Sequence, residues 1–384
     1  MCAAEARPSV ASRAAGLRAL RVDNVGSMLR PAQLLEAIRR HEAGETSPEQ
    51  LERAEDQAVE RLVRTQEAHG LPIIVDGEFR RRQFMESFAD VSGFDQWAAR
   101  HARAKAGRIE SGGRIEAPSA RALTPATEPL QLRRNVPLDE YRFIRSLTER
   151  PAKVTLIGPE RILSAYDAAG SRGVYADLAA FAADVIAVQR EMIRGLLDAG
   201  CGYVHIDAPG FTRFADASSV RRMLAAGEQP EAVMARAIEA ENAVIADFDD
   251  ITFGVHLCRG NEQSRWHREG TYDAIAERLF GELRHDRLLL EYDSDRAGGF
   301  APLRFVRPDT VVVLGLITTK SGRLEDPDDL CRRIEEAARY VPVERLALSP
   351  QCGFASTFEG NELTEDDQWR KLDLMLEVAA RVWS

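Results

Sequence analysis

Short apolar runs rich in β-branched residues alternate with helix-length segments along almost the whole chain, and this alternation constrains the fold more than any other feature. In the helix-length segments, apolar residues recur three and four positions apart, which is typical of helices with one buried face. Strands that alternate with helices favour a parallel sheet. Eight apolar runs predict strands, over residues 20–25, 73–76, 153–157, 203–207, 251–257, 288–292, 310–317 and 346–349.

Eight strand–helix units predict a protein of the α/β class, a single (β/α)8 TIM barrel over residues 19–384. Residues 79–151 separate the second and third strands, and we interpret them as a long insertion over the mouth of the barrel. Within it, the stretch GRIESGGRIE places two short alternating segments around a Gly-Gly pair, which predicts a β-hairpin. Residues 1–18 are expected to form a flexible tail. The clearest predicted helices cover residues 175–199, 220–248, 272–283, 327–340 and 365–382.

Composition excludes several classes of protein. Acidic residues outnumber basic ones by 61 to 51, giving a net charge of −10, and no basic block indicates a nucleic-acid partner. No apolar run approaches the roughly 20 residues that a membrane span needs. The 5 cysteines are too few and too scattered for a disulfide scaffold. We therefore expect a cytoplasmic enzyme without nucleic-acid or membrane partners.

Four residues that follow or end predicted strands suggest a metal site. His256 and Cys258, in GVHLCRGN, are two positions apart at a strand end, so their side chains share a face. Glu291 ends an apolar strand, where an unpaired carboxylate would be costly, and Cys352 follows the last strand beside a glycine. Imidazole and thiolate ligands favour Zn²⁺, and barrel enzymes place their sites at the carboxyl ends of strands. The alternative is two buried cysteines, a glutamate paired with a helix and a solvated histidine.

Six stretches carry a resemblance to a known family: VDGEFRR, HIDAPGF, VHLCRGN, LLLEYDSDRAG, LGLITTKSGRLED and LSPQCGFAS. In this order they resemble the cobalamin-independent methionine synthases, most closely their short, single-barrel bacterial members. The resemblance covers residues 22–383. It implies a zinc ion held by His256, Cys258, Glu291 and Cys352, and a homocysteine thiolate that attacks the methyl group of 5-methyltetrahydrofolate. A free thiol has a pKa of about 8.5, and coordination to zinc deprotonates it.

The resemblance also implies a grip on an amino-acid substrate. Glu78 and Asp207 match carboxylates that hold its amino group, and Ser27 matches the position that receives its carboxylate. On this reading Asp207 serves the substrate rather than the metal. From the sequence alone, Glu78 and Asp207 could instead pair with local arginines such as Arg80, and Ser27 could be a turn cap. His205 shares the face of Asp207. Support of the residues that bind metal or substrate and simple core packing are equally consistent with its position.

Two departures from the long enzymes concern the methyl donor. Lys320 stands where those enzymes carry a histidine for acid–base chemistry, and we expect Lys320 and Asp207 to be the catalytic residues. Pro159 stands near the position of an aromatic residue that stacks on the folate. The small-molecule thiol could therefore receive its group from another donor, such as a methylcorrinoid on a carrier protein or another electrophile. A non-catalytic zinc or thiol-binding barrel is the third reading, although such a barrel would not need the amino-acid grip.

Overall fold

The computed structural model describes residues 16–95, 108–109, 114–116 and 123–383. At its centre lies a parallel sheet of six strands in the order β10-β9-β8-β7-β6-β5. Each neighbouring pair is also consecutive along this part of the chain, so the expected α/β class is confirmed. The strands are β5 (Val154–Ile157), β6 (Tyr203–Asp207), β7 (Thr252–Leu257), β8 (Arg287–Glu291), β9 (Val311–Ile317) and β10 (Leu346–Pro350).

The first two predicted strands, 20–25 and 73–76, are reduced to single parallel bridges. Val22 pairs with Leu348 of β10, and Ile74 pairs with Ala152, just before β5. Each bridge therefore extends one edge of the six-stranded sheet. The second segment turns away after its bridge, because Gly77 and Glu78 adopt left-handed backbone conformations, with φ of 71° and 59°. Local backbone geometry, rather than a lack of apolar residues, shortens this strand.

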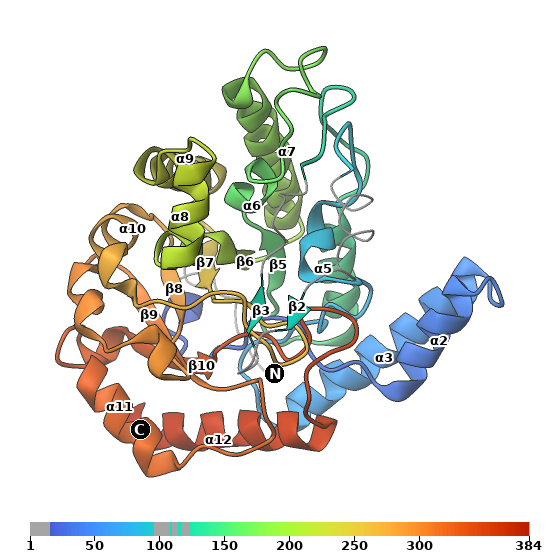
Figure 1. Cartoon of the computed structure of the whole chain (residues 1–384). Coiled ribbons are helices and arrows are strands. Elements are labelled where there is room, and N and C mark those ends of the chain that lie inside the picture. The colour runs from blue at the N-terminus through green and yellow to red at the C-terminus, as the bar shows by residue number, and fades with distance from the viewer. Residues whose placement is uncertain (1–15, 96–107, 110–113, 117–122, 384) are drawn as a thin grey trace, which may run out of the picture.

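Helices surround the central strands, and α2 and α3 project beyond them (Figure 1). The predicted helix 220–248 is two helices, because Gly227 ends the first with a φ of 76° and Pro230 begins the second. No described helix has both the length and the apolar character that crossing a membrane requires. The α-helices are α2 (Ala32–Glu42), α3 (Pro48–Ala68), α5 (Val136–Leu147), α6 (Pro159–Leu163), α7 (Leu178–Asp198), α8 (Ala217–Ala225), α9 (Pro230–Ile245), α10 (Ala276–Glu282), α11 (Pro327–Ala337) and α12 (Glu365–Trp383).

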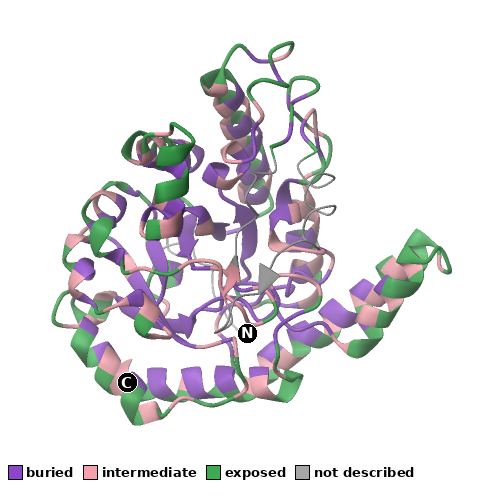
Figure 2. Cartoon of the chain, in the orientation of Figure 1, coloured by how far each residue is buried: buried purple, intermediate pink, exposed green. Residues whose placement is uncertain are grey.

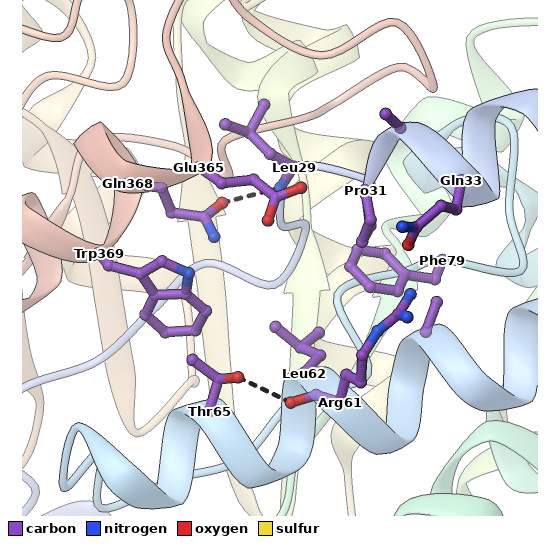
Figure 3. A pocket seen from close by; sticks show the side chains of 12 residues that line it. Leu29, Pro31, Gln33, Arg61, Leu62, Thr65, Phe79, Glu365, Gln368 and Trp369 are labelled. Atoms are coloured by element: carbon purple, nitrogen blue, oxygen red, sulfur yellow. Dashed lines mark hydrogen bonds between the residues drawn. The ribbon is translucent and has the colours of Figure 1, made fainter.

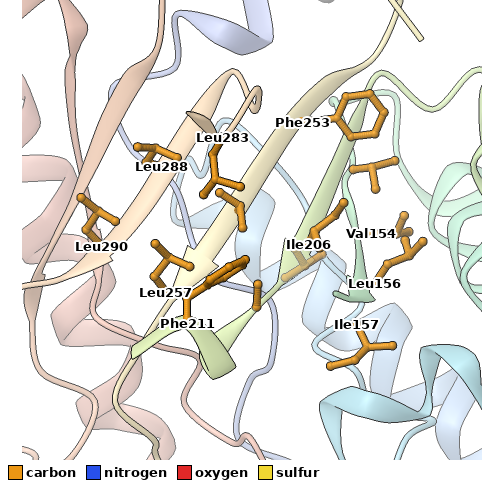
Figure 4. Close-up of a cluster of buried hydrophobic side chains, with 14 of the residues drawn as sticks. Val154, Leu156, Ile157, Ile206, Phe211, Phe253, Leu257, Leu283, Leu288 and Leu290 are labelled. Atoms are coloured by element: carbon orange, nitrogen blue, oxygen red, sulfur yellow. The ribbon is translucent and has the colours of Figure 1, made fainter. Parts of the chain in front are cut away.

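The two faces of the sheet have different roles. Ile206, Leu288 and Leu290 belong to the large core between strands and helices (Figure 4), and buried residues concentrate on the strands and the helix sides that face them (Figure 2). Leu289 and Val313 pack together in a separate small cluster on the opposite face. Because side chains alternate along a strand, Glu291 shares the face of Leu289. The predicted site residues on the strands therefore point away from the helices.

The segment 79–151 contains structure of its own. It includes η1 (Phe84–Phe88) and the strands β1 (Val91–Ser92) and β4 (Gln131–Leu132), which pair with each other, followed by α5. The two arms of the predicted hairpin, β2 (Arg108–Ile109) and β3 (Ile115–Glu116), pair antiparallel, and the turn between them lies outside the described residues. The Ile115 N–H donates to the Trp266 carbonyl at 2.8 Å. This contact brings the hairpin to the loop after β7.

The predicted tail, residues 1–18, falls mostly outside the described residues. Leu17 is nevertheless buried, in a cluster with Ile73 and Tyr203, and Arg18 forms an ion pair with Asp286 at 3.0 Å. The ordered fold therefore includes at least two residues that the sequence assigned to the tail.

Candidate active site

Three of the four predicted metal ligands meet at the carboxyl edge of the sheet. His256 lies near the end of β7, Cys258 directly follows that strand, and Cys352 follows β10 after one residue. All three are buried, and their ligand atoms lie within 4.8 Å of one another. The turn after Cys352 requires glycine, because a Cβ on Gly353 would clash with the Ser27 hydroxyl. The expected convergence of these strand ends is thus found for an imidazole and two sulfurs.

The charges of these three groups suit a divalent cation. A hydrogen bond from Cys258 lowers the pKa of Cys352 to about 6, while that same bond, followed by burial, raises the pKa of Cys258 well above its usual value. Burial lowers the pKa of His256, but the Asp207 hydrogen bond and the Cys352 charge outweigh it and raise that pKa to about 9. The lowered pKa of Cys352 favours its thiolate form, and the raised pKa of His256 favours its imidazolium form. A cation such as Zn²⁺ would displace protons and bind both sulfurs as thiolates, so the donor set fits zinc.

Glu291, the fourth predicted ligand, lies outside that group of three. Its carboxylate accepts a hydrogen bond from the Arg259 backbone N–H at 2.5 Å and another from Arg296 Nη2 at 3.2 Å. Lys320 Nζ lies 3.8 Å away. The charge of Glu291 also contributes to the raised pKa of Cys258, after the Cys352 hydrogen bond, burial and the Cys352 charge. Glu291 is therefore adjacent to the sulfurs but bound to cations.

Asp207 orients the imidazole, a role that was not anticipated from the sequence. His256 Nδ1 donates to Asp207 Oδ1 at 3.0 Å, and Nε2 donates to the Gln351 carbonyl at 3.1 Å. His205 Nε2 lies 3.4 Å from the same Asp207 oxygen. Burial alone would raise the pKa of Asp207, but its contacts with His205 and His256 hold that pKa well below its usual value. Asp207 thus contacts a predicted metal ligand, in addition to the substrate role that the resemblance implies for it.

Glu78 is the second carboxylate of the predicted substrate grip. Asp76 accepts the Glu78 N–H at 3.0 Å and so supports its left-handed backbone, and Thr155 donates to its carboxylate at 2.7 Å. Burial, opposed by Arg81 and reinforced by the charge of Asp207, raises the pKa of Glu78 to about 7. Two carboxylates close enough to influence each other favour a cation between them, such as a substrate ammonium group.

Of the local arginines that the alternative reading considers, Arg80 pairs with Asp56 and lies 3.6 Å from Glu55, whereas Arg81 Nη1 lies 3.9 Å from Glu78 Oε1. Ser27 is also at the site: its carbonyl accepts the Phe354 N–H at 2.9 Å, and its hydroxyl faces Gly353, next to Cys352. The structure therefore places Ser27 against the turn that follows Cys352.

Lys320 follows β9 at the same edge of the sheet. Its ammonium lies 3.6 Å from Asp293 Oδ2 and 3.8 Å from Glu291 Oε1. Asp293 and Arg296, which complete this charged cluster, were not anticipated from the sequence. Asp293 could have been found, because it stands two positions after Glu291 in LLLEYDSDRAG and such spacing recurs on one face of an extended chain.

A fully buried charge network supports the site from beneath. Lys153 Nζ donates to Asp23 at 2.6 Å and lies 3.4 Å from His205 Nδ1, and Tyr203 and Arg287 also donate to Asp23. These contacts connect the first residues of β6 and β8, and the residue just before β5, with His205. His205 in turn lies against Asp207. The signal in the sequence was a lysine that opens the apolar strand KVTLI.

A separate cavity of about 430 Å³ lies on the outer side, between α3 and α12. Leu62, Phe79 and Trp369 supply apolar walls, and Arg61 and Glu365 supply charges (Figure 3). Its lining includes none of the predicted site residues, so it is distinct from the candidate active site.

A parallel sheet with a thiolate–imidazole group at its carboxyl edge defines an α/β protein with a candidate metal–thiolate centre. The chain belongs to the cobalamin-independent synthase family: the profile described as "Cobalamin-independent synthase, Catalytic domain" matches residues 22–381. This membership confirms the resemblance seen in the sequence and supports a methyltransferase.

Two relatives illustrate the similarity of this chain to known proteins. The chain is 38% identical over 373 residues to the uncharacterized protein YxjH of Bacillus subtilis, covering 94% of each chain. It is 24% identical over 333 residues to a methionine synthase of Thermococcus kodakarensis, covering 86% of this chain and 85% of that protein.

Solved structures share the fold over nearly the full length. The chain is similar to a putative vitamin-B12-independent methionine synthase from Listeria monocytogenes, with a TM-score of 0.71, 26% identity, and 95% of this chain and 98% of that one covered. A B12-independent methionine synthase from Shewanella, solved in complex with selenomethionine, gives a TM-score of 0.69 at 18% identity, with 94% and 97% covered. The second likeness concerns the fold alone.

Proposed function

We propose that the protein is a zinc-dependent S-methyltransferase that methylates the thiol of homocysteine, or of a similar amino acid, to give methionine or its analogue. The nominal methyl donor is 5-methyltetrahydrofolate. The observation that carries this proposal is the meeting of His256, Cys258 and Cys352 beside the two carboxylates Asp207 and Glu78. A thiol-binding metal and an ammonium-binding pair together fit an amino acid that carries a thiol.

In this proposal His256, Cys258 and Cys352 hold the zinc ion, with Glu291 as a fourth, weaker ligand. Bound zinc would supply the charge that keeps a coordinated substrate thiol ionised at neutral pH. Glu78 and Asp207 bind the substrate ammonium group, and Ser27 binds its carboxylate. These contacts fix the sulfur next to the methyl donor, which supplies the orientation that a bimolecular step otherwise lacks.

Lys320 is proposed to donate the proton that the donor nitrogen needs as its bond to the methyl carbon breaks and the new sulfur–carbon bond forms. A general acid at this place is required, because an unprotonated amine nitrogen is a poor leaving group. Pro159, buried at the start of α6, stands near the expected place of the folate-stacking aromatic residue. This observation favours a second candidate, in which a methylcorrinoid or another electrophile replaces the folate.

We further propose that residues 19–384 form one closed (β/α)8 barrel with the insertion 79–151, and that the protein acts in the cytoplasm. The bridges at Val22 and Ile74 support closure, because they extend opposite edges of the parallel sheet. The function is tested with the purified zinc protein, homocysteine and a panel of methyl donors, with methionine as the readout. Absence of methionine with every donor, despite bound zinc and homocysteine, would refute the methyltransferase.

Exchange of Asp207 for asparagine is expected to weaken both zinc and amino-acid binding. The asparagine amide would keep the shape but lose the charge that orients His256, and loss of such a partner typically lowers metal affinity roughly 10- to 100-fold. Zinc affinity is measured by chelator competition and amino-acid affinity by calorimetry. Ser27→Ala is the matched control, since it should weaken only the amino acid. Unchanged zinc affinity in Asp207→Asn would contradict the orienting role of the carboxylate.

Binding of methionine is expected to weaken as the pH falls through the pKa of Glu78, about 7. Below that pH, Glu78 is protonated and must lose its proton to pair with an ammonium group, which reduces affinity by up to about tenfold per pH unit. Methionine is used because it has no thiol proton to release. Calorimetry between about pH 5 and pH 8 measures how methionine affinity changes with pH. In this range the ammonium and carboxylate groups of free methionine keep their charges, so a change in affinity reports on the protein. Glu78→Gln should bind weakly with a flat profile, and a flat profile for the unsubstituted protein would reject this role.

A further inference from the structure

The carboxylate of Glu291 has partners that compete with a metal. Arg296 Nη2 donates to its Oε1 at 3.2 Å, Lys320 Nζ lies 3.8 Å from the same oxygen, and the Arg259 N–H occupies Oε2 at 2.5 Å. The Glu291 side chain is fully buried, and those of Lys320 and Arg296 are 9% and 18% exposed. Ion pairs so shielded from water are screened little and keep most of their strength.

Arg296 is held in position by a separate contact. Its guanidinium lies 4.3 Å from the ring centroid of Trp266, within the range of cation–π attraction. It lies in the short helix η5 (Asp295–Ala297), which follows β8 after three residues. The cation that meets Glu291 therefore also has a contact with the loop after β7.

Asp293 gives these cations a second partner. Arg296 Nη2 lies 3.6 Å from Asp293 Oδ1, and Lys320 Nζ lies 3.6 Å from Asp293 Oδ2. While Glu291 stays in this cluster, the two cations are balanced by the carboxylates of Glu291 and Asp293. If Glu291 turns to a metal, Asp293 still pairs with both cations, so neither cation is left buried without a partner. The cluster can therefore release Glu291 and take it back.

We infer that Arg296 and Lys320 form a cationic holder that competes with zinc for the Glu291 carboxylate. This inference rests on the proposed zinc site and deepens it. By drawing Glu291 away from His256, Cys258 and Cys352, the holder keeps the fourth position on the metal available to the substrate thiol. Arg296 and Lys320 act here as positioning residues through Glu291, and they set how tightly the metal is held and how readily the thiol enters.

Zinc affinity in a double-mutant cycle tests the holder. The four proteins are the unsubstituted chain, Arg296→Gln, Glu291→Gln and the double variant, each measured by competition with a zinc chelator. Arg296→Gln should bind zinc roughly tenfold more tightly. This is the lower end of the change in metal affinity that follows when a residue in contact with a metal ligand is replaced. In the Glu291→Gln background, the same change should alter affinity by no more than about twofold, as for uncoupled sites.

Loss of a nearby positive charge could tighten zinc through the field alone, and the cycle separates the two causes. A field effect persists without Glu291, so equal tightening in both backgrounds would overturn the inference. Two controls sharpen this reading. Arg296→Lys keeps the charge and should bind zinc like the parent. Arg268→Gln removes a cation that donates to the Pro209 carbonyl instead, and it should show no dependence on Glu291.

Thiol binding gives a second readout. Homocysteine affinity of the zinc-loaded protein should fall roughly tenfold in Arg296→Gln, because the released Glu291 competes with the thiol for the fourth position on zinc. This change is as large as the expected change in zinc affinity. If Arg296→Gln does not fold, Lys320→Met replaces it in the same cycle with the same expected result. A parent protein that binds no zinc would refute the proposed function and the inference together. Zinc binding with an additive cycle would refute the inference alone.

Discussion

Replacement of Cys352 by serine is expected to leave the protein folded but almost free of zinc. The hydrogen bond from Cys258 lowers the pKa of Cys352 to about 6, so Cys352 is the sulfur of the group that ionises more readily. A serine hydroxyl does not ionise at neutral pH and is a poor zinc ligand. The parent protein should contain about one zinc per chain, and the variant less than roughly a tenth of that, as expected when a thiolate ligand is lost.

Metal content by mass spectrometry and folding by circular dichroism check this result. The variant should stay folded, because a large apolar core surrounds the sheet independently of the site, unlike a zinc finger. Cys201→Ser is the matched control: that thiol is also buried, and it donates to the Tyr203 carbonyl at 3.3 Å, outside the ligand group. Full zinc in both Cys352→Ser and Cys258→Ser would show that the metal site is wrong.

The six strands of the sheet could be predicted from sequence because strands covered on both faces read as continuous apolar runs. The segments 20–25 and 73–76 also carry apolar residues, yet each forms only one bridge. In the first, Asp23 and the Asn24 carbonyl bind Lys153, which lies far away in the sequence. In the second, positive φ values at Gly77 and Glu78 turn the chain. Neither cause is visible in a hydrophobic pattern.

The site was predictable where it depends on strand alternation and hidden where it depends on register. His256 and Cys258 could be placed on one face by their spacing alone. The contact of Asp207 with His256 depends on the register that pairs these two residues across β6 and β7, and no local signal reports it. Likewise, the cations around Glu291 come from a short helix after β8 and from the segment that follows β9. Spacing along a strand can predict which side chains converge, but it does not predict which of them form ion pairs with each other.

Lys320 is the proposed acid of the reaction, and its contacts explain how it would serve. Its ammonium lies between Asp293 and Glu291, at 3.6 Å and 3.8 Å, and its side chain is 9% exposed. Two carboxylates hold the positive charge at the rim of the site, next to the group that would bind the substrate thiol. A proton is thus available on the side from which a methyl donor would approach.

Exchange of Lys320 for alanine is therefore expected to reduce methyl transfer from 5-methyltetrahydrofolate by about a hundredfold or more, which is within the usual contribution of a general acid. Zinc should be held more tightly, because Glu291 loses a competing cation, and homocysteine should still bind, although roughly tenfold more weakly. Single-turnover formation of methionine measures the transfer step. A methylated corrinoid, which needs no proton on its leaving group, should be used by the variant and its parent at similar rates. Rapid turnover with the folate in Lys320→Ala would show that another group supplies the proton.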